Sequence, residues 1–124
     1  MHTEIYIDPK IDMNSDNYIS ILIEFKVKSA KVAVATSVSN ITLEQANQMV
    51  EESHHLFQKE LEYLNEQQIT YTVNQAYKDS FNGVSVRLKG NTIKYFLQST
   101  VIKAIYKNQE MDIPKRPVDT RYQI

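Results

Sequence analysis

The feature that most constrains the fold is a strict alternation of apolar and polar side chains that begins at Tyr18. Side chains that repeat every second residue lie on one face of a β-strand, so this alternation predicts a strand with one buried face. The apolar positions are Ile19, Ile21, Ile23, Phe25 and Val27, and the polar positions are Ser20, Glu24, Lys26 and Lys28. Leu22 is an apolar residue on the polar face. We therefore expect Leu22 to point outward from the strand.

A long amphipathic helix is predicted between Thr42 and about Gln67. Thr42 and Gln45 have the spacing of a capping box, in which each side chain bonds a free backbone N–H at the start of a helix. The apolar stripe at helical spacing consists of Leu43, Ala46, Met49, Val50, Leu56, Phe57, Leu61 and Leu64. Residues 29–41, which precede this helix, are compatible with a helical turn, a short strand or an irregular connection.

Two further strands are predicted to form a hairpin, followed by a short helix and a last strand. The hairpin strands run from Ile69 toward Tyr77 and from Val84 to Leu88, and both show alternation. Asn82-Gly83 between them is typical of a tight reversal with positive φ angles. Asn91 is predicted to cap the short helix, and Val101–Lys107 is predicted to be the last strand.

This order of elements predicts an α+β fold of ferredoxin-like βαββαβ topology. Right-handed crossovers would place both helices on one face of a four-stranded antiparallel sheet, with the first and third strands in the centre. The other face, here called the open face, would carry no helix. Residues 1–17 are predicted to be a polar leader, 18–108 the domain and 109–124 an extended C-terminal tail, since Pro114 and Pro117 disfavour a helix there.

Composition narrows the function classes. A length of 124 residues corresponds to one domain, and a net charge of -1 provides no basic footprint for nucleic acid. No apolar run approaches the roughly 20 residues of a membrane span, and the N-terminus has no signal-peptide core, so any export signal is expected to be absent from this chain. The lack of cysteine excludes disulfides and thiolate metal sites, and two glycines exclude a glycine-rich phosphate loop. We expect no cofactor.

No catalytic, cofactor-binding or metal-binding residue is predicted. His54 and His55 are adjacent on the helix, so they point about 100° apart and cannot share a metal ion. We interpret these histidines, with Glu51 and Glu52, as part of a solvated helix face. Ser85 lies inside a strand rather than at a strand-to-helix turn, which argues against a nucleophile.

The open face is the remaining candidate for function. Its central strands lack the aromatic rings that bind RNA bases in other sheets of this topology, so RNA binding is disfavoured. The outward residues Ser20, Leu22, Thr70, Thr72 and Ser85 are short and uncharged apart from one leucine. Such a face suits packing against the helices of another protein, but an ordinary solvated sheet also uses Ser and Thr. From these residues alone both interpretations stay open.

Three segments together resemble a known family. They are the hairpin Tyr77–Leu88 with Phe81-Asn82-Gly83-Val84-Ser85, the preceding Ile69-Thr70-Tyr71, and the closing segment Val101–Asn108. Over about Tyr18 to Asn108 the chain resembles the propeptide, or peptidase inhibitor, domain of subtilisin-like serine proteases. The resemblance is strongest to the minor extracellular protease type of bacilli.

The resemblance implies a secreted, non-enzymatic propeptide whose partner is the mature protease domain of the same precursor. Such propeptides act as intramolecular chaperones and as temporary inhibitors. Their open face packs on two surface helices of the protease, and the tail lies in the substrate cleft like a retained product. The implied interface residues are Ser20, Leu22, Thr70, Thr72, Ser85, Tyr106 and Asn108, and the implied cleft-binding residues are Arg121, Tyr122, Gln123 and Ile124.

One feature departs from the family pattern, and two other classes of protein are also considered. Tyr106 and Asn108 stand where subtilisin propeptides place carboxylates that cap the protease helices, so Asn108 would accept the same hydrogen bonds without the charge. A small-ligand-binding regulatory domain of ferredoxin-like topology is the main alternative, and it would usually dimerise through its sheet edges. A small enzyme such as an acylphosphatase would need an anion-binding loop with an arginine ahead of Tyr18, and none is present.

Overall fold

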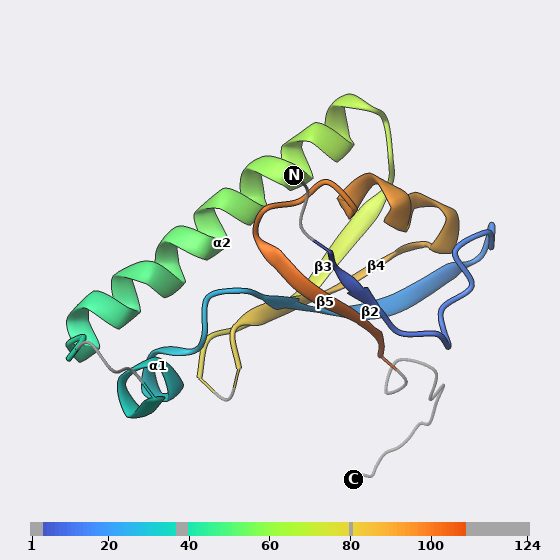
Figure 1. Ribbon diagram of the computed structural model, residues 1–124. Coiled ribbons are helices and arrows are strands. Elements are labelled where there is room, and N and C mark those ends of the chain that lie inside the picture. Colours follow the sequence, from blue (N-terminus) through green and yellow to red (C-terminus); the bar gives the residue numbers. More distant parts are fainter. Residues whose placement is uncertain (1–3, 37–39, 80, 109–124) are drawn as a thin grey trace, which may run out of the picture.

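A five-stranded sheet forms one layer of the fold, and helices cover one of its faces (Figure 1). The computed structural model describes residues 4–36, 40–79 and 81–108. Within these residues the strands are β1 (Tyr6–Ile7), β2 (Tyr18–Phe25), β3 (Tyr71–Tyr77), β4 (Gly83–Lys89) and β5 (Ile102–Lys107). The helices are α1 (Ala30–Thr36), α2 (Leu43–Glu66) and the 3-10 helix η1 (Gly90–Phe96). The predicted α+β class is confirmed.

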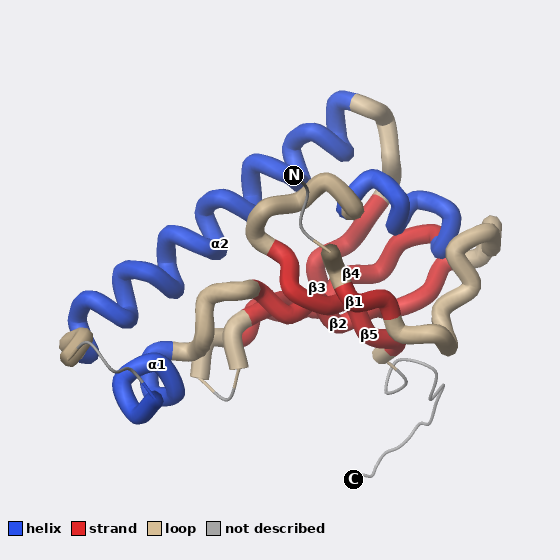
Figure 2. The backbone as a smooth tube through the Cα atoms, viewed as in Figure 1, coloured by secondary structure: helices blue, strands red, loops and turns tan. Residues whose placement is uncertain are grey.

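The strand order is β1-β5-β2-β4-β3, and Figure 2 shows α2 above the strands and α1 at the lower left, beyond the end of the sheet. Strands β5, β2, β4 and β3 pair antiparallel, and β2 and β4 are central among them, as expected of the first and third predicted strands. The prediction of a four-stranded antiparallel sheet with two helices is wrong, because the described residues contain a fifth strand and a third helix. Strand β1 pairs parallel with β5. Helix α1 lies in the segment 29–41, whose sequence pattern was ambiguous.

Residues 4–17 pack on the domain, although the sequence suggested a polar leader. Ile11 is buried in the main core, and Ile5, Ile7 and Met13 pack against that core. The Asp8 carboxylate accepts the backbone N–H of Lys107 at 3.0 Å, at the end of β5. Ile5, Ile7, Ile11 and Met13 stand at alternate positions, but Pro9 interrupts this pattern, which leaves too short a run to predict a strand without knowledge of its partner.

Helix α2 begins and ends where the sequence predicts. The Thr42 side chain accepts the N–H of Gln45, and the Gln45 side chain accepts the N–H of Thr42. The buried side of the helix is narrower than predicted: it consists of Ala46, Val50, Ser53, Phe57, Leu61 and Leu64. Leu43, Met49 and Leu56 are exposed. The first half of α2 extends beyond the sheet toward α1 (Figure 1), so Leu43 and Met49 lie outside the small cluster that Ala46 and Val50 form with Ala30.

The hairpin and the short helix also differ from the sequence expectation. Strand β3 has a bulge between Val73 and Gln75, and neither glycine of the chain has a positive φ. Gly83 is instead required because β2 passes so close that a Cβ would collide with the Ile23 carbonyl oxygen. The cap residue of η1 is Lys89, without a side-chain hydrogen bond, so the predicted cap at Asn91 is wrong.

Candidate functional site

The pairing register places the predicted interface residues on the open face. Leu22 of β2 lies opposite Ser85 of β4 and opposite Tyr106 of β5. Directly opposed residues of antiparallel strands point to the same side of the sheet, so these three side chains share the open face. Ser20 and Thr72 join them, because each lies opposite Arg87.

The remaining two predicted residues lie at the borders of this face. The N–H of Asn108 donates to the Ser20 carbonyl oxygen at 2.9 Å, so the β5–β2 ladder continues one residue beyond the end of β5. Thr70 is exposed and precedes β3, which begins at Tyr71. The predicted tail residues Arg121, Tyr122, Gln123 and Ile124 lie outside the described residues.

The open face has a floor of short side chains. Ser20 and Ser85 are each only 2% exposed, and the Ser20 hydroxyl has no hydrogen-bond partner among the described residues. Leu22 and Tyr106 are partly exposed beside them. A partner on this face would therefore touch the larger side chains first, while the two serines keep the centre flat.

Tyrosines frame this floor, and sequence reasoning missed three of them. By register, Tyr6, Tyr18, Tyr77 and Tyr106 all lie on the open face. The alternation that begins at Tyr18 already placed that ring on the same face as Ser20. Tyr77 was harder to predict, because the bulge after Val73 exchanges the two faces of β3.

The one carboxylate of β2 also points to the open face. The Tyr106 hydroxyl donates to the Glu24 carboxylate at 3.4 Å, and the Lys103 ammonium lies 3.8 Å from the other carboxylate oxygen. Burial raises the pKa of the Tyr106 hydroxyl, and the negative charge of Glu24 adds to this effect. The hydroxyl therefore stays protonated at neutral pH and can hold Glu24 in place.

A buried polar cluster lies on the face of the sheet opposite to the open face. It joins the residue before β4 to α2. The Asn82 side-chain amide donates to the Val27 carbonyl oxygen at 3.0 Å and to the Ser53 hydroxyl at 2.9 Å. The Asn82 side-chain oxygen lies 2.8 Å from the His54 ring nitrogen Nε2, and the His54 ring packs edge-on against Phe25. The interpretation of His54 as part of a solvated helix face is therefore wrong. The cluster therefore ties the hairpin to α2 and to the residues that follow β2.

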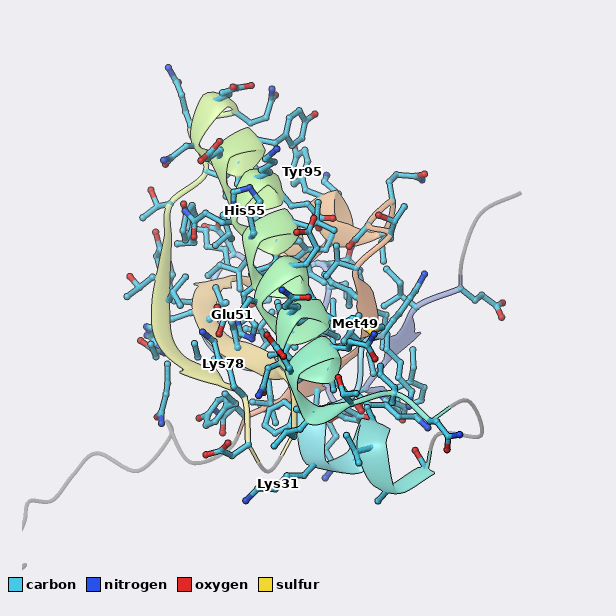
Figure 3. The ribbon with its side chains drawn as sticks, turned by 90° about the vertical axis from the view of Figure 1, so that its left-hand side faces the viewer. Lys31, Met49, Glu51, His55, Lys78 and Tyr95 are labelled. Atoms are coloured by element: carbon cyan, nitrogen blue, oxygen red, sulfur yellow. The ribbon has the colours of Figure 1, made fainter. Side chains whose placement is uncertain are left out.

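The rest of the outer helix face agrees with a solvated surface. Figure 3 looks onto α2 and shows Glu51 beside Lys78, whose charged groups lie 3.0 Å apart. His55 is exposed. Within residues 4–36, 40–79 and 81–108, no group of three or more acidic or histidine side chains could hold a metal ion. None of the helices in that part of the chain is long and apolar enough to cross a membrane.

The environment of His54 predicts a loss of stability in mild acid. Burial lowers the pKa of His54, and Lys78 adds to this effect, while Asn82 and Glu51 oppose it. The unfolded chain takes up this proton near pH 6.5, whereas the folded protein takes it up only at lower pH. The contribution of His54 to the free energy of unfolding should therefore be highest above pH 6.5. It should fall as the pH decreases from 6.5 through the lower pKa that His54 has in the folded protein.

Urea unfolding between pH 5 and pH 8 measures this effect. His54→Gln should flatten the decrease below pH 6.5, and His55→Gln, at an exposed neighbouring position, should leave it unchanged. Both variants retain Glu60, whose pKa is raised by burial. The contribution of Glu60 to the free energy of unfolding has the opposite pH dependence, and it is the same in both variants. An identical acid profile in wild type and His54→Gln would contradict the prediction.

A flat sheet face framed by tyrosines is typical of surfaces that bind other proteins. The comparison with family models agrees with this class and is more specific: residues 14–114 match peptidase inhibitor I9. The chain belongs to this family, which comprises inhibitory propeptide domains of subtilisin-like proteases. Inhibitor domains of this kind are non-catalytic, in agreement with the prediction that the chain is not itself an enzyme.

The other comparisons add no closer relative. No curated protein and no solved structure matches the chain. The specific resemblance to the minor extracellular protease type is therefore not supported by a relative. The family match begins before Tyr18 and extends past Asn108, so it is wider on both sides than the predicted domain.

Proposed function

We propose that this chain is the propeptide of a secreted subtilisin-like serine protease. Its partner is the mature protease domain of the same precursor, and it acts both as an intramolecular chaperone and as a temporary inhibitor. The family match over residues 14–114 carries this proposal and favours it over a small-ligand regulatory domain. The ferredoxin-like topology that the resemblance implies agrees with the order β5-β2-β4-β3 of the antiparallel strands.

The geometry of the open face supports docking on surface helices of the protease. Leu22 and Tyr106 are directly opposed on neighbouring strands, so they offer one apolar patch at the centre of the face. The short side chains of Ser20 and Ser85 leave room for helices to approach closely. A flat sheet against two helices is an ordinary way to bury apolar surface between protein layers.

Glu24 supplies a negative charge beside Tyr106, which is one of the two positions where the resemblance leads one to expect a carboxylate. The Tyr106 hydroxyl and the Lys103 ammonium hold the Glu24 side chain on the open face. A carboxylate there can accept hydrogen bonds from the free N–H groups at the start of a protease helix, which the helix dipole strengthens. Asn108 can accept a further hydrogen bond without charge.

The chaperone role follows from the same surface. A protease domain with many long-range strand contacts folds slowly, because distant segments must meet before they stabilise each other. A preformed face that binds its helix pair would stabilise the folding transition state. The inhibitory role assigns residues 109–124 to the substrate cleft, where an extended segment can add to the edge strands that bind substrate.

An inhibition assay tests the proposal. The intact chain is mixed with mature subtilisin-like proteases, including the protease domain of its own precursor, while hydrolysis of a small peptide substrate is followed. Hydrolysis should stop first and recover later, as the protease cleaves the chain. A serine protease of the trypsin fold serves as the control and should keep its activity. Undiminished hydrolysis by the precursor's own protease at large molar excess of the chain would contradict the proposal.

A further inference from the structure

Strand β1 lies outside the residues that match the family, yet it is built firmly into the sheet. The N–H of Asp8 donates to the Ile105 carbonyl oxygen at 2.9 Å, and the Asp8 carboxylate accepts the N–H of Lys107 at 3.0 Å. Ile5 and Ile7 pack against the core on the inner side. The strand is therefore held from two directions, by backbone pairing and by apolar packing.

This anchoring places Tyr6 on the open face at the edge of the sheet. Tyr6 is paired with Ala104, which shares the open face with Glu24, and its side chain is 54% exposed. The centre of its ring lies 5.7 Å from that of Tyr106. Because Leu22 is opposite Tyr106, the three side chains form a continuous apolar row across β2, β5 and β1.

A depression of about 460 Å³ borders this row. Its lining is Glu4, Ile5, Tyr6, Ile7, Lys103, Ala104 and Tyr106. Ala104 is 2% exposed and forms its floor, and the rings of Tyr6 and Tyr106 contribute apolar surface. The depression can receive an apolar side chain of a partner, which would otherwise contact only the flat centre of the face.

We propose that β1 extends the protease-binding face beyond the family's shared domain, with Tyr6 as a contact residue beside Tyr106. This inference rests on the proposed function and names the same partner, a subtilisin-like protease domain. We assign this partner because Tyr6 contacts Tyr106, and Tyr106 lies opposite Leu22 in the proposed protease-binding face. The row from Leu22 to Tyr6 is therefore one continuous surface. Exposed tyrosines on rigid strands are favourable contacts, because little side-chain freedom is lost on binding.

The test compares three variants of the full chain in the inhibition assay. Tyr6→Thr removes the ring but retains a residue that favours strands, and it should raise the inhibition constant about tenfold, as expected for a tyrosine at the core of an interface. Tyr6→Phe should inhibit like the wild type. Tyr63→Ala is the matched control, because Tyr63 is 49% exposed on α2, which covers the other face of the sheet (Figure 1). It should also inhibit like the wild type.

The outcomes separate this inference from the proposed function. If wild type fails to inhibit, both are overturned. If wild type inhibits and Tyr6→Thr inhibits equally well, the extension of the face is wrong and the proposed function stands.

Amide hydrogen exchange at Asp8, whose N–H donates to Ile105, shows whether β1 is still paired in Tyr6→Thr, and weakened inhibition with an unpaired β1 would assign the effect to the strand rather than to the ring. Sedimentation of the free chain completes the test: a dimer that dissociates in Tyr6→Thr would assign the surface to a second copy and overturn the proposal.

Discussion

Leu22→Lys should weaken inhibition of the protease about a hundredfold while leaving the domain folded. Leu22 is partly exposed at the centre of the open face, between Ser85 and Tyr106. In the free domain a lysine there can extend into solvent, so the surface substitution should cost little. In the complex its ammonium would face apolar groups of the protease, and burying such a charge without a partner costs several kcal/mol. A loss of about 3 kcal/mol corresponds to the hundredfold change.

One neighbouring side chain adds to the expected loss of inhibition. Glu24 points to the same face two residues further along β2, so the new lysine could form an ion pair with it in the free domain. That pair would be exposed and would contribute little to stability. Forming this pair would also take Glu24 away from the Tyr106 hydroxyl. Glu24 would then no longer be held in place to cap a protease helix, so docking would weaken further.

The matched control is Met49→Lys, which places the same charge on an exposed apolar side chain of α2, away from the open face. This variant should inhibit like the wild type. Circular dichroism and urea unfolding verify that both variants fold. A Leu22→Lys variant that folds and inhibits as strongly as Met49→Lys would show that the open face does not meet the protease.

The strongly periodic parts of the chain were predictable because their structure depends on local patterns. The alternation around Leu22 gives β2 its inner and outer faces, and the capping box at Thr42 gives α2 its start. The candidate face followed from the same alternation, which is why Ser20, Leu22 and Ser85 share a side of the sheet. Prediction worked where neighbours in sequence determine the side-chain direction.

The parts that were missed depend on contacts between distant segments. Strand β1 consists of two residues and exists because Asp8, directly after it, bonds to Ile105 and Lys107 of β5, near the other end of the chain. Ser53 is polar, yet it belongs to the buried stripe of α2 between Val50 and Phe57, and His54 lies half-buried beside it. Their spacing was a usable signal, but only the distant partner Asn82 makes burial of these polar groups favourable.

The open face also depends in part on contacts between distant segments. An alternating pattern predicts one direction for every second residue, but the bulge in β3 shifts that register and brings Tyr77 to the open face. Tyr6 reaches the face only through the pairing of β1. Periodicity could therefore not reveal Tyr6 and Tyr77, although it already placed Tyr18 on the same face as Ser20.

Deletion of residues 109–124 should separate the two proposed activities. The last described hydrogen bond of the β5–β2 ladder joins Asn108 to Ser20, and the core ends before it, at Ile105. A chain that ends at Asn108 should therefore fold with nearly unchanged stability. Its inhibition constant on the mature protease should rise about a hundredfold or more, because the cleft-binding segment is no longer tethered near its site at high effective concentration.

Assistance to folding should change far less, since the face around Leu22 and Tyr106 survives the deletion. The yield of active protease refolded with the truncated chain should stay within about twofold of the yield with the intact chain, because the interface that stabilises the folding transition state is intact. Leu22→Lys in the full-length chain is the opposing control and should lower both activities. Full inhibition by the truncated chain would mean that docking of the sheet alone closes the cleft and that the tail is a linker. A truncated chain that has lost both activities would place the docking surface in the tail instead.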